Sequence, residues 1–315
     1  MTASSIDRHQ RLSGGLVGLL VGDALGVPYE FHPPEAIPPA EQIEFIPPAG
    51  FQRAHLGVPP GTWSDDGAQA LVLLDSLLVC GDLDLGHFAK GLRRWQLEGF
   101  YAVNRSVFDI GVQTSTALTR LGRGVSPDVS GPSAEGHNGN GSLMRVLPLV
   151  LWHRGDDQAL VQLAGRQSLP THGHPRSQIA CAVYCLWARA VLEKNADPWE
   201  SAVARFHAKG CAELFPADEV RLVLDSGNAT AARGTGYVVD TLWSAKAAVE
   251  DTTNFEACVR RAITLGHDTD TTAAVAGGIA GLLYGRDAIP KRWQQSLRAR
   301  DLYEPLLSQL LERYQ

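Results

Sequence analysis

Cysteine is scarce in this sequence, and the few cysteines that it has are not closely paired. The five cysteines are odd in number and scattered, with no CxxC pair: Cys80, Cys181, Cys185, Cys211 and Cys258. A disulfide framework or a thiolate zinc site needs matched sets of cysteines, so the spacing argues against both. Unpaired thiols are typical of a reducing compartment, and we expect a cytoplasmic protein.

An excess of charge of one sign is also lacking. The 315 residues include 28 Lys and Arg and 34 Asp and Glu, which gives a formal net charge of −6 without any block of like charge. Binding along a nucleic-acid backbone needs a basic surface, so a nucleic-acid scaffold is not expected. Hydrophobic residues make up 44% of the chain and charged residues 20%, which is ordinary for a globular protein and argues against global disorder.

The sequence lacks apolar runs with the length and flanking features that a membrane-spanning or exported protein needs. Residues 12–22 follow two arginines and outline a secretory signal, but the run is rich in glycine and continues into Asp23 without a convincing cleavage site. The second apolar run, 273–284, is far shorter than the roughly 20 residues of a membrane span. We therefore expect a soluble protein with no membrane partner.

Alternating strand patterns are almost absent, whereas helical spacing recurs along the chain. Apolar residues predict a first helix that ends near Pro28 and a second one around 70–78, separated by an extended loop with eight prolines over 33–60. Further helices are expected at 85–98, 105–121, 141–153, 176–193, 236–250, 254–265, 271–284 and 302–313. This pattern favours an all-α fold with a single domain over 1–315.

The first chemical signal is GTWSDDG, residues 61–67, which comes immediately before a helical stripe. Ser64 is well placed as an N-cap, and Asp65 and Asp66 fall in the first turn, where the helix dipole favours negative charge. Capping alone explains a serine and one aspartate, but two adjacent carboxylates repel each other. A hard cation such as magnesium, manganese or calcium would relieve that repulsion, because it prefers oxygen ligands.

The segment GHDTDTT, residues 266–272, repeats this arrangement before another apolar stretch. Asp268 and Asp270 alternate with threonines, so two carboxylates and a hydroxyl can converge on a cation or simply cap a helix. Small residues over 273–281 let this helix pack closely on a neighbour. If the two acidic helix starts meet, their oxygens suit a pair of metal ions about 3.5–4 Å apart. A calcium-binding loop is not expected, because the longer ligand run with its closing glutamate is missing.

A glycine-rich turn ends the polar stretch 122–140. Gly139, Asn140, Gly141 and Ser142 come before a predicted helix, and backbone N–H groups in such a turn can hold a pyrophosphate. Taken alone, the same four residues also fit a plain loop with a serine N-cap. The motif content favours a binding loop over a domain linker.

Taken together and in order, these motifs resemble the ADP-ribosylglycohydrolase family. The resemblance covers nearly the whole chain, from GLLVGDALGVPYEF (18–31) to GHDTDTTAAVAGGIAGLLYG (266–285). Between them lie GTWSDDGAQAL (61–71), FDIGVQTSTAL (108–118), EGHNGNGSLMRVLPL (135–149), QSLPTHGHP (167–175) and GTGYVVDTLWSA (234–245). Each block is weak evidence by itself, and the complete ordered set is strong evidence.

The resemblance implies a compact, orthogonal helical bundle with two divalent cations, Mg²⁺ or Mn²⁺, in a cleft. It also implies hydrolysis of the glycosidic bond that joins ADP-ribose to an acceptor. Carried over by motif, the metal ligands would be Ser64, Asp65, Asp66, Asp268, Asp270 and Thr271, with Asp270 as the bridging carboxylate. Glu30 falls on the mobile glutamate of the family, near the metals.

The resemblance further implies which residues meet the substrate. It places diphosphate recognition at 139–142 and puts Glu135 and Gly136 near the adenosine or ribose. Because the other candidate ligands are oxygens, we favour His172 as a contact to ADP-ribose rather than to a metal, while His174 is either a site or a packing residue. Asp109 matches a family acid that contacts the substrate beside the scissile bond and that can face a guanidinium. In the same block, Val112 replaces a frequent asparagine.

The predicted function is metal-assisted removal of ADP-ribose from a modified protein or a small conjugate, above all from ADP-ribosylarginine. Either Glu30 or Asp65 would take the proton of the attacking water. The alternatives are hydrolysis of O-linked ADP-ribose, on serine or in O-acetyl-ADP-ribose, and a non-catalytic relative of the crystallin kind. The complete set of candidate metal ligands favours an enzyme. A two-metal phosphohydrolase would need basic residues near the cations, and the motif blocks contain only Arg145.

Overall fold

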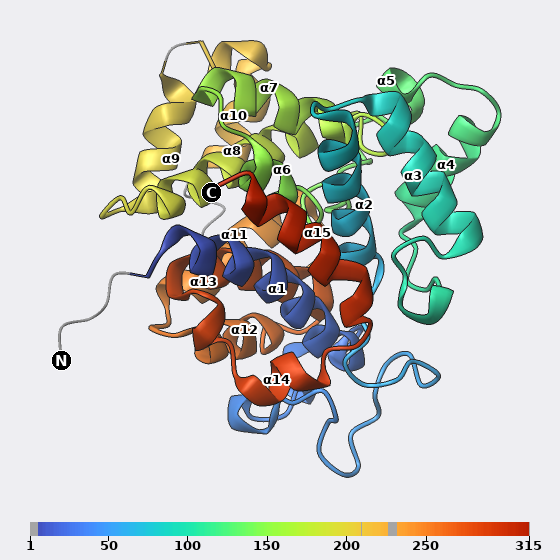
Figure 1. Cartoon of the computed structure of the whole chain (residues 1–315), viewed down its shortest axis with the longest axis vertical. Helices are drawn as coiled ribbons and strands as arrows, with labels where there is room; N and C mark the ends of the chain where they lie inside the picture. The colour runs from blue at the N-terminus through green and yellow to red at the C-terminus, as the bar shows by residue number, and fades with distance from the viewer. Residues whose placement is uncertain (1–5, 209, 226–231, 315) are drawn as a thin grey trace.

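The computed structural model describes residues 6–208, 210–225 and 232–314 (Figure 1). Within these ranges every regular element is a helix, apart from an isolated bridge between Gly139 and Tyr237. The predicted all-α fold is therefore confirmed.

The α-helices are α1 (Arg8–Gly26), α2 (Asp65–Cys80), α3 (Leu85–Glu98), α4 (Val112–Gly122), α5 (Pro127–Ser130), α6 (Leu147–Trp152), α7 (Asp157–Ser168), α8 (Pro175–Leu192), α9 (Pro198–His207), α10 (Ala217–Leu224), α11 (Val238–Glu250), α12 (Phe255–Ile263), α13 (Thr269–Tyr284), α14 (Lys291–Ser296) and α15 (Arg300–Glu312). Short 3₁₀ helices are η1 (Val27–Tyr29), η2 (Pro34–Ala36), η3 (Ala40–Gln42), η4 (Val103–Arg105), η5 (Ala212–Leu214) and η7 (Arg286–Ala288).

Two predicted helices begin later than the sequence pattern indicated. The helix expected from 105 starts only at Val112, because Arg105 and Asp109 adopt left-handed backbone angles, with φ of 57° at each. The helix expected from 141 starts at Leu147, after a series of turns. In both places the residues that precede the helix are loop residues, and several of them line the cavity described below.

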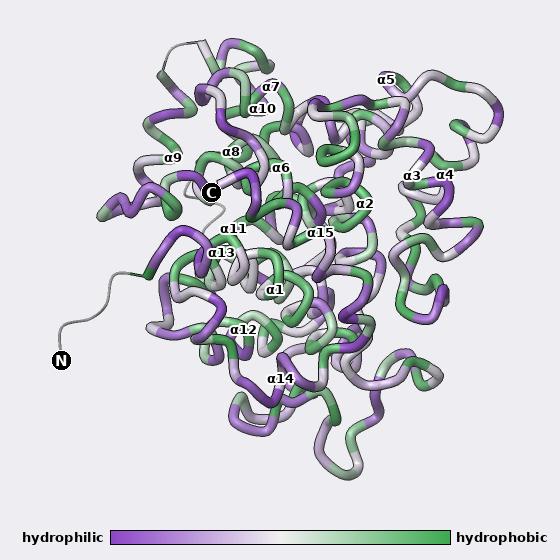
Figure 2. The backbone as a smooth tube through the Cα atoms, viewed as in Figure 1, coloured by the Kyte–Doolittle hydropathy of each residue, from purple (hydrophilic) through white to green (hydrophobic). Residues whose placement is uncertain are grey.

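Helix α1 lies at the centre of the molecule and pairs with α13 (Figure 1). Every residue of α1 from Leu12 to Gly26 is buried, and hydrophobic residues dominate this helix in Figure 2. The stretch Arg8–Tyr29 is long and apolar enough to cross a membrane by length and composition, yet its apolar window is wholly buried inside the protein. The run that outlines a secretory signal is thus a core helix of this fold.

Glycine lets α1 and α13 approach until their backbones touch. Four glycines recur at every fourth residue along α1 and face α13: Gly14, Gly18, Gly22 and Gly26. A Cβ atom on Gly18 would lie 2.3 Å from the carbonyl oxygen of Gly277, and one on Gly22 would lie 2.1 Å from that of Ala273. Real side chains do not come this close, so the four positions admit only glycine at this helix spacing.

The end of this contact determines where α13 begins. A Cβ atom on Gly26 would lie 2.4 Å from the Cα atom of Asp270, and the Thr269 hydroxyl donates to the Gly26 carbonyl oxygen at 2.8 Å. The first turn of α13 is therefore held against the last turn of α1. The predicted close packing of α13 on a neighbour is confirmed, and the neighbour is α1.

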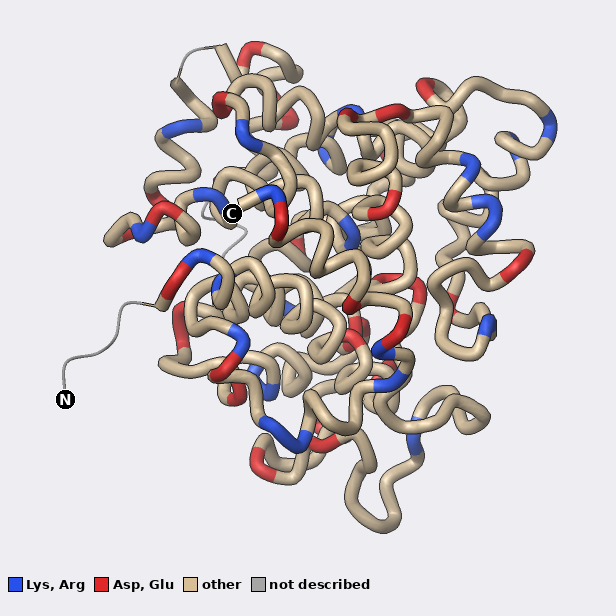
Figure 3. Tube along the Cα trace, viewed as in Figure 1, with Lys and Arg blue, Asp and Glu red and all other residues tan. Residues whose placement is uncertain are grey.

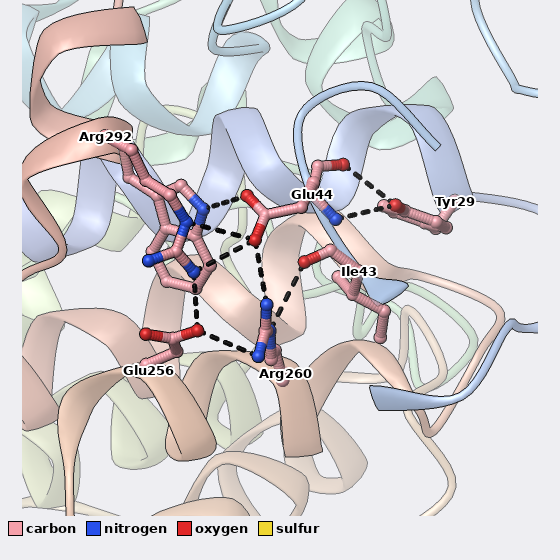
Figure 4. A network of polar contacts seen from close by, with 7 residues as sticks. Tyr29, Ile43, Glu44, Glu256, Arg260 and Arg292 are labelled. Carbon is pink, nitrogen blue, oxygen red and sulfur yellow. Dashed lines mark hydrogen bonds and ion pairs between the residues drawn. The ribbon is translucent and has the colours of Figure 1, made fainter. Parts of the chain in front are cut away.

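The long loop between α1 and α2 is anchored by a polar network around Glu44 (Figure 4). The Tyr29 hydroxyl donates to the Glu44 carbonyl oxygen at 2.8 Å and accepts from its N–H at 3.0 Å. The Glu44 carboxylate accepts from Arg260 of α12 at 2.8 Å and from Arg292 of α14 at 2.9 Å. The proline-rich loop is thereby tied to two helices near the other end of the sequence.

The cysteines are all free, and four of the five are buried. Cys181, Cys185, Tyr184 and Trp187 lie in α8 within the hydrophobic core, as the helical apolar pattern predicted. His174, whose role the sequence left open, is the N-cap of α8: its Nδ1 accepts from the Arg176 N–H at 3.2 Å.

We predict that Gly18→Ala destabilises the protein by about 3 kcal/mol, although alanine is the better helix former, because its methyl group pushes α1 and α13 apart. Urea unfolding at constant m-value measures the change. Gly57→Ala is the control, since a Cβ atom there meets nothing within 4 Å. Equal midpoints for the two variants would show that the helix pair tolerates a side chain.

Candidate active site

The two acidic helix starts lie side by side, as the sequence analysis required. The Ser64 hydroxyl caps α2 by accepting from the Asp66 N–H at 3.4 Å, and two aspartates occupy the first turn. Asp268 is the N-cap of α13, and Asp270 lies in its first turn. The Thr271 hydroxyl donates to Asp66 Oδ2 at 3.4 Å, which joins the two helix starts through one hydrogen bond.

These carboxylates are buried without a basic partner. Asp65, Asp66 and Asp270 are buried, and no ion pair among the described residues involves them. Burial raises the pKa of each carboxyl group well above its ordinary value, and repulsion from neighbouring carboxylates raises it further. Such a concentration of buried negative charge must be neutralised, either by protons on the carboxyl groups or by bound cations.

The donor atoms fit a centre of hard divalent cations. In the described part of the chain, Asp66 Oδ1 and Asp270 Oδ2 are buried oxygens without a hydrogen-bond partner. Glu30, Asp268 and Asp270 also offer carboxylate oxygens that all lie within 4.8 Å of one another. Unpaired buried oxygens are costly, and oxygen-only donor sets suit Mg²⁺, Mn²⁺ or Ca²⁺ better than Zn²⁺.

Glu30 reaches this acidic group from the loop after α1. Burial, followed by repulsion from Asp109 and other carboxylates, raises the pKa of Glu30 to about 10. Its Oε2 lies 2.7 Å from His55 Nε2, which is also 4.0 Å from Asp109 Oδ1. The rings of Phe31 and Phe108 flank the His55 ring, with centroids 5.5 and 5.1 Å away. His55 is a site residue that sequence reasoning missed, because a lone histidine in a proline-rich loop carries no signal.

A cavity of about 310 Å³ opens beside the carboxylates. Nine residues predicted to act on substrate or metal line it: Glu30, Asp65, Asp109, Gly139, Asn140, Gly141, His172, Asp268 and Thr271. Phe31 and Val112 also line the cavity and are 69% and 86% exposed. Ser64, Asp66 and Asp270 lie behind this wall, as buried residues that do not line the cavity.

The glycine-rich turn is held against the acidic group. Asn140 Nδ2 donates to Asp268 Oδ2 at 2.8 Å and to Thr241 Oγ1 at 2.9 Å. The His172 ring lies against the same turn, since a Cβ atom on Gly141 would be 2.8 Å from His172 Cε1. The turn needs glycine at this position because the imidazole takes the space of a side chain.

Three residues predicted to contact the substrate do not line this cavity. Ser142 is buried, and its hydroxyl accepts from Ser168 Oγ at 2.8 Å, so the side chain faces the core instead. The Glu135 side chain is 87% exposed and lies 4.0 Å from Arg176. Gly136 has open space around it. A role for any of these three in binding stays a prediction.

Asp23 is a buried carboxylate that the motif analysis did not single out. It accepts from the backbone N–H groups of Ser64 at 2.8 Å and Gly67 at 2.7 Å, and thus ties α1 to the start of α2. Burial raises the pKa of Asp23 to about 7, although these two hydrogen bonds act in the opposite direction. The available signal was its place as a single charge inside the apolar run GLLVGDALG.

Four of the nine described non-glycine residues with positive φ angles lie at or beside this cavity. Phe31, His55, Asp109 and His267 have positive φ angles of 64°, 49°, 57° and 60°. For residues with a side chain such angles cost free energy, and they persist where the surrounding structure holds them for function. One hydrogen bond, from the Phe31 N–H to the His267 carbonyl oxygen at 2.7 Å, holds two of these residues together.

Comparisons with known proteins agree with one another. The family model described as ADP-ribosylglycohydrolase matches residues 4–315. The ADP-ribosylarginine hydrolase Tri1 of Serratia proteamaculans is 31% identical over 98% of this chain and 80% of its own length. The ADP-ribosyl-[dinitrogen reductase] glycohydrolase of Rhodospirillum rubrum is 29% identical over 94% of this chain and 92% of its own length.

A more distant relative is the ADP-ribosylhydrolase ARH3 of Mus musculus, which is 26% identical over 91% of this chain and 87% of its own length. A solved structure titled "ADP-ribosylglycohydrolase-related protein complex" has a TM-score of 0.78 at 34% identity and covers 97% of this chain, with 98% of its own chain matched. The family model, the curated relatives and the solved structure each match nearly the full length of this chain. This chain belongs to the ADP-ribosylglycohydrolase family.

Proposed function

We propose that this protein is a divalent-cation-dependent hydrolase that removes ADP-ribose from modified arginine in proteins. The observation that carries the proposal is the meeting of two acidic helix starts beside a cavity with a glycine-rich turn. The similarity, over nearly the whole of this chain, to proteins named hydrolases of ADP-ribosylarginine and of ADP-ribosyl-[dinitrogen reductase] supports the acceptor.

The proposed metal ligands are those carried over by motif: Ser64, Asp65, Asp66, Asp268, Asp270 and Thr271. Asp66 Oδ2 accepts from two hydroxyl groups, and Asp270 Oδ1 accepts from the Thr271 N–H at 2.8 Å, so each carboxylate keeps its other oxygen for a cation. When bound, two Mg²⁺ or Mn²⁺ ions would hold the ribose hydroxyls and polarise the attacking water.

Proton transfer needs a carboxylate that is held in place but has a free oxygen. Asp65 Oδ2 accepts from Gln69 Nε2 at 2.9 Å, and Glu30 Oε2 lies 2.7 Å from His55 Nε2. Bound cations would oppose the rise in the pKa of each carboxyl group, which would then have one oxygen engaged and one available to take a proton from water in the cavity. Both residues line the cavity, and we propose that one of them is the general base.

We propose that Asp109 faces the guanidinium of the acceptor. Its carboxylate lines the cavity, and a carboxylate can bind a guanidinium through two parallel hydrogen bonds. In the glycine-rich turn, the Gly139 N–H donates to Gln113 Oε1 at 3.2 Å and the Asn140 N–H to the Gly236 carbonyl oxygen at 3.1 Å. We therefore propose that the diphosphate meets the backbone at Gly141, since a phosphate group needs close N–H donors. The complete set of acidic donors argues against a non-catalytic relative.

Asp270→Asn is expected to lower ADP-ribose release by about 1,000-fold, because several kcal/mol of transition-state stabilisation depend on the cations. Asp270→Asn should remain folded without bound cations, because the substitution removes charge repulsion from a buried cluster of carboxylates. Release from an ADP-ribosylarginine protein measures the effect, with the exposed Asp301→Asn as control. Full activity in Asp270→Asn would refute the metal assignment.

Removal of divalent cations is expected to lower the melting temperature, and Mg²⁺ or Mn²⁺ should restore it. At a cation concentration 100 times the dissociation constant, binding stabilises the fold by about 2.7 kcal/mol. Thermal melts with chelator and with graded cation measure the shift. The same titration on Asp270→Asn should give little shift, and an equal shift in both proteins would place the cations elsewhere.

Arginine-linked ADP-ribose is expected to be released faster than serine-linked ADP-ribose, and only with added metal. Asp109→Asn should slow release from arginine about 30-fold, because it removes a charge-assisted hydrogen bond, and should affect the serine substrate less. Parallel assays on the two conjugates measure the difference. An equal loss of activity on both conjugates would mean that Asp109 does not distinguish arginine from serine as the acceptor.

A further inference from the structure

A buried arginine lies between the acidic group and the His172 side of the cavity. Arg145 is 0% exposed, and it forms no ion pair with any residue that the structure describes. Its guanidinium donates only to neutral oxygens: Gln69 Oε1 and Thr171 Oγ1 at 2.8 Å each, the Gln167 carbonyl oxygen at 3.0 Å and Gln167 Oε1 at 3.2 Å. A buried charge is expensive even when it is hydrogen-bonded, so this placement calls for a function.

The first consequence concerns the orientation of Asp65. A guanidinium can only donate, so Arg145 selects the carbonyl oxygen of the Gln69 side chain and turns its amide nitrogen the other way. That nitrogen donates to Asp65 Oδ2 at 2.9 Å. Gln69 thus transmits the orientation imposed by Arg145 to a carboxylate in the cavity wall, without adding charge of its own.

The second consequence concerns the proton on His172. Thr171 Oγ1 accepts from Arg145 Nη2, and its own proton has an acceptor in His172 Nδ1 at 2.8 Å. When Nδ1 accepts this hydrogen bond it carries no proton, and the neutral imidazole then has its proton on Nε2. Burial, together with the nearby positive charge of Arg145, lowers the pKa of His172 well below its ordinary value.

The proton on His172 Nε2 faces the glycine-rich turn. Cβ atoms built on Gly141 and Gly139 would lie 3.2 and 3.6 Å from this nitrogen, and all three residues line the cavity. Through this N–H group, His172 offers a hydrogen-bond donor to a ligand. It does not offer a lone pair to a metal ion or act as a proton acceptor.

We propose that Arg145 is a positioning residue for both sides of the cavity: through Gln69 it orients Asp65, and through Thr171 it fixes His172 as a neutral Nε2–H donor. The acceptor for this N–H group would be a ligand oxygen at the glycine-rich turn. We assign this oxygen to the diphosphate of an ADP-ribose conjugate. That last assignment rests on the proposed function, whereas the protonation of His172 does not.

The protonation of His172 can be read by long-range ¹H–¹⁵N NMR of the histidine rings in the full-length protein. The His172 signals are assigned by their loss in His172→Gln. The expected pattern is an unprotonated Nδ1 and a protonated Nε2 at neutral pH. A protonated Nδ1, or protons on both nitrogens, would overturn the proposal whatever the enzyme hydrolyses.

A matched pair of variants separates the Thr171 link from a structural role. Thr171→Val keeps the shape and removes the hydroxyl, and Thr171→Ser keeps the hydroxyl. We expect Thr171→Val to give mixed His172 tautomers and about a tenfold weaker dissociation constant for ADP-ribose, the equivalent of one hydrogen bond, and Thr171→Ser to restore both. Unchanged NMR signals and affinity in Thr171→Val would contradict the link. If Thr171→Val does not fold, the spectra of the wild type and Thr171→Ser still decide the tautomer.

The Gln69 link has a different signature. Gln69→Met should lower kcat about tenfold, since Asp65 loses the donor that orients it, while the His172 signals and ADP-ribose affinity stay unchanged. Arg145→Lys, whose single ammonium cannot serve both links, should alter both readouts. Identical effects of Gln69→Met and Thr171→Val would refute two separate links. A wild type with the expected tautomer that releases no ADP-ribose would refute the proposed function alone.

Discussion

The contact between the backbones of α1 and α13 is the constraint on which the rest of the structure depends. With glycine at every fourth position of α1, no side chain separates the helices, and the first turn of α13 lies against the last turn of α1. Asp270 is therefore placed by helix packing. Asp23, on the same helix α1, holds the backbone of Ser64 and Gly67, and so positions the start of α2. One helix thus sets the location of both acidic helix starts.

This arrangement concentrates negative charge in the interior of the protein, whereas elsewhere charges of both signs are mixed. Along the trace, acidic and basic residues are interspersed without long runs of one sign, as Figure 3 shows, and the described ion pairs, such as Arg205 with Glu193, bring opposite charges together. Around Asp66 and Asp270, carboxylates instead meet carboxylates in the interior. The apolar core and the backbone hydrogen bonds offset this cost, and bound cations would turn the repulsion into attraction.

Local signals made both helix starts predictable from the sequence. Ser64 caps α2 through its hydroxyl, because capping and the helix dipole depend only on neighbouring residues. Asp268 holds the N-cap position of α13 without a side-chain capping hydrogen bond, and its carboxylate accepts from Asn140 instead. The partner of α13 was harder to predict, although the four-residue spacing of glycine on α1 contained the information. Ser142 shows a further limit: the glycine-rich turn was found, but the direction of one side chain within it depends on Ser168, which is 26 residues away.

Arg145 shows why the support of a site is harder to predict than the site itself. No local pattern links it to Gln69, which is 76 residues earlier. Its partners lie within the motif blocks, but they are neutral residues to which the motifs gave no role. The neutrality has a physical reason. A direct ion pair with Asp65 would occupy the oxygen that a cation needs and would compete with it, whereas an intervening amide orients the carboxylate and leaves its charge available. Arg145 can therefore orient Asp65 through one intervening side chain, Gln69, without neutralising its charge.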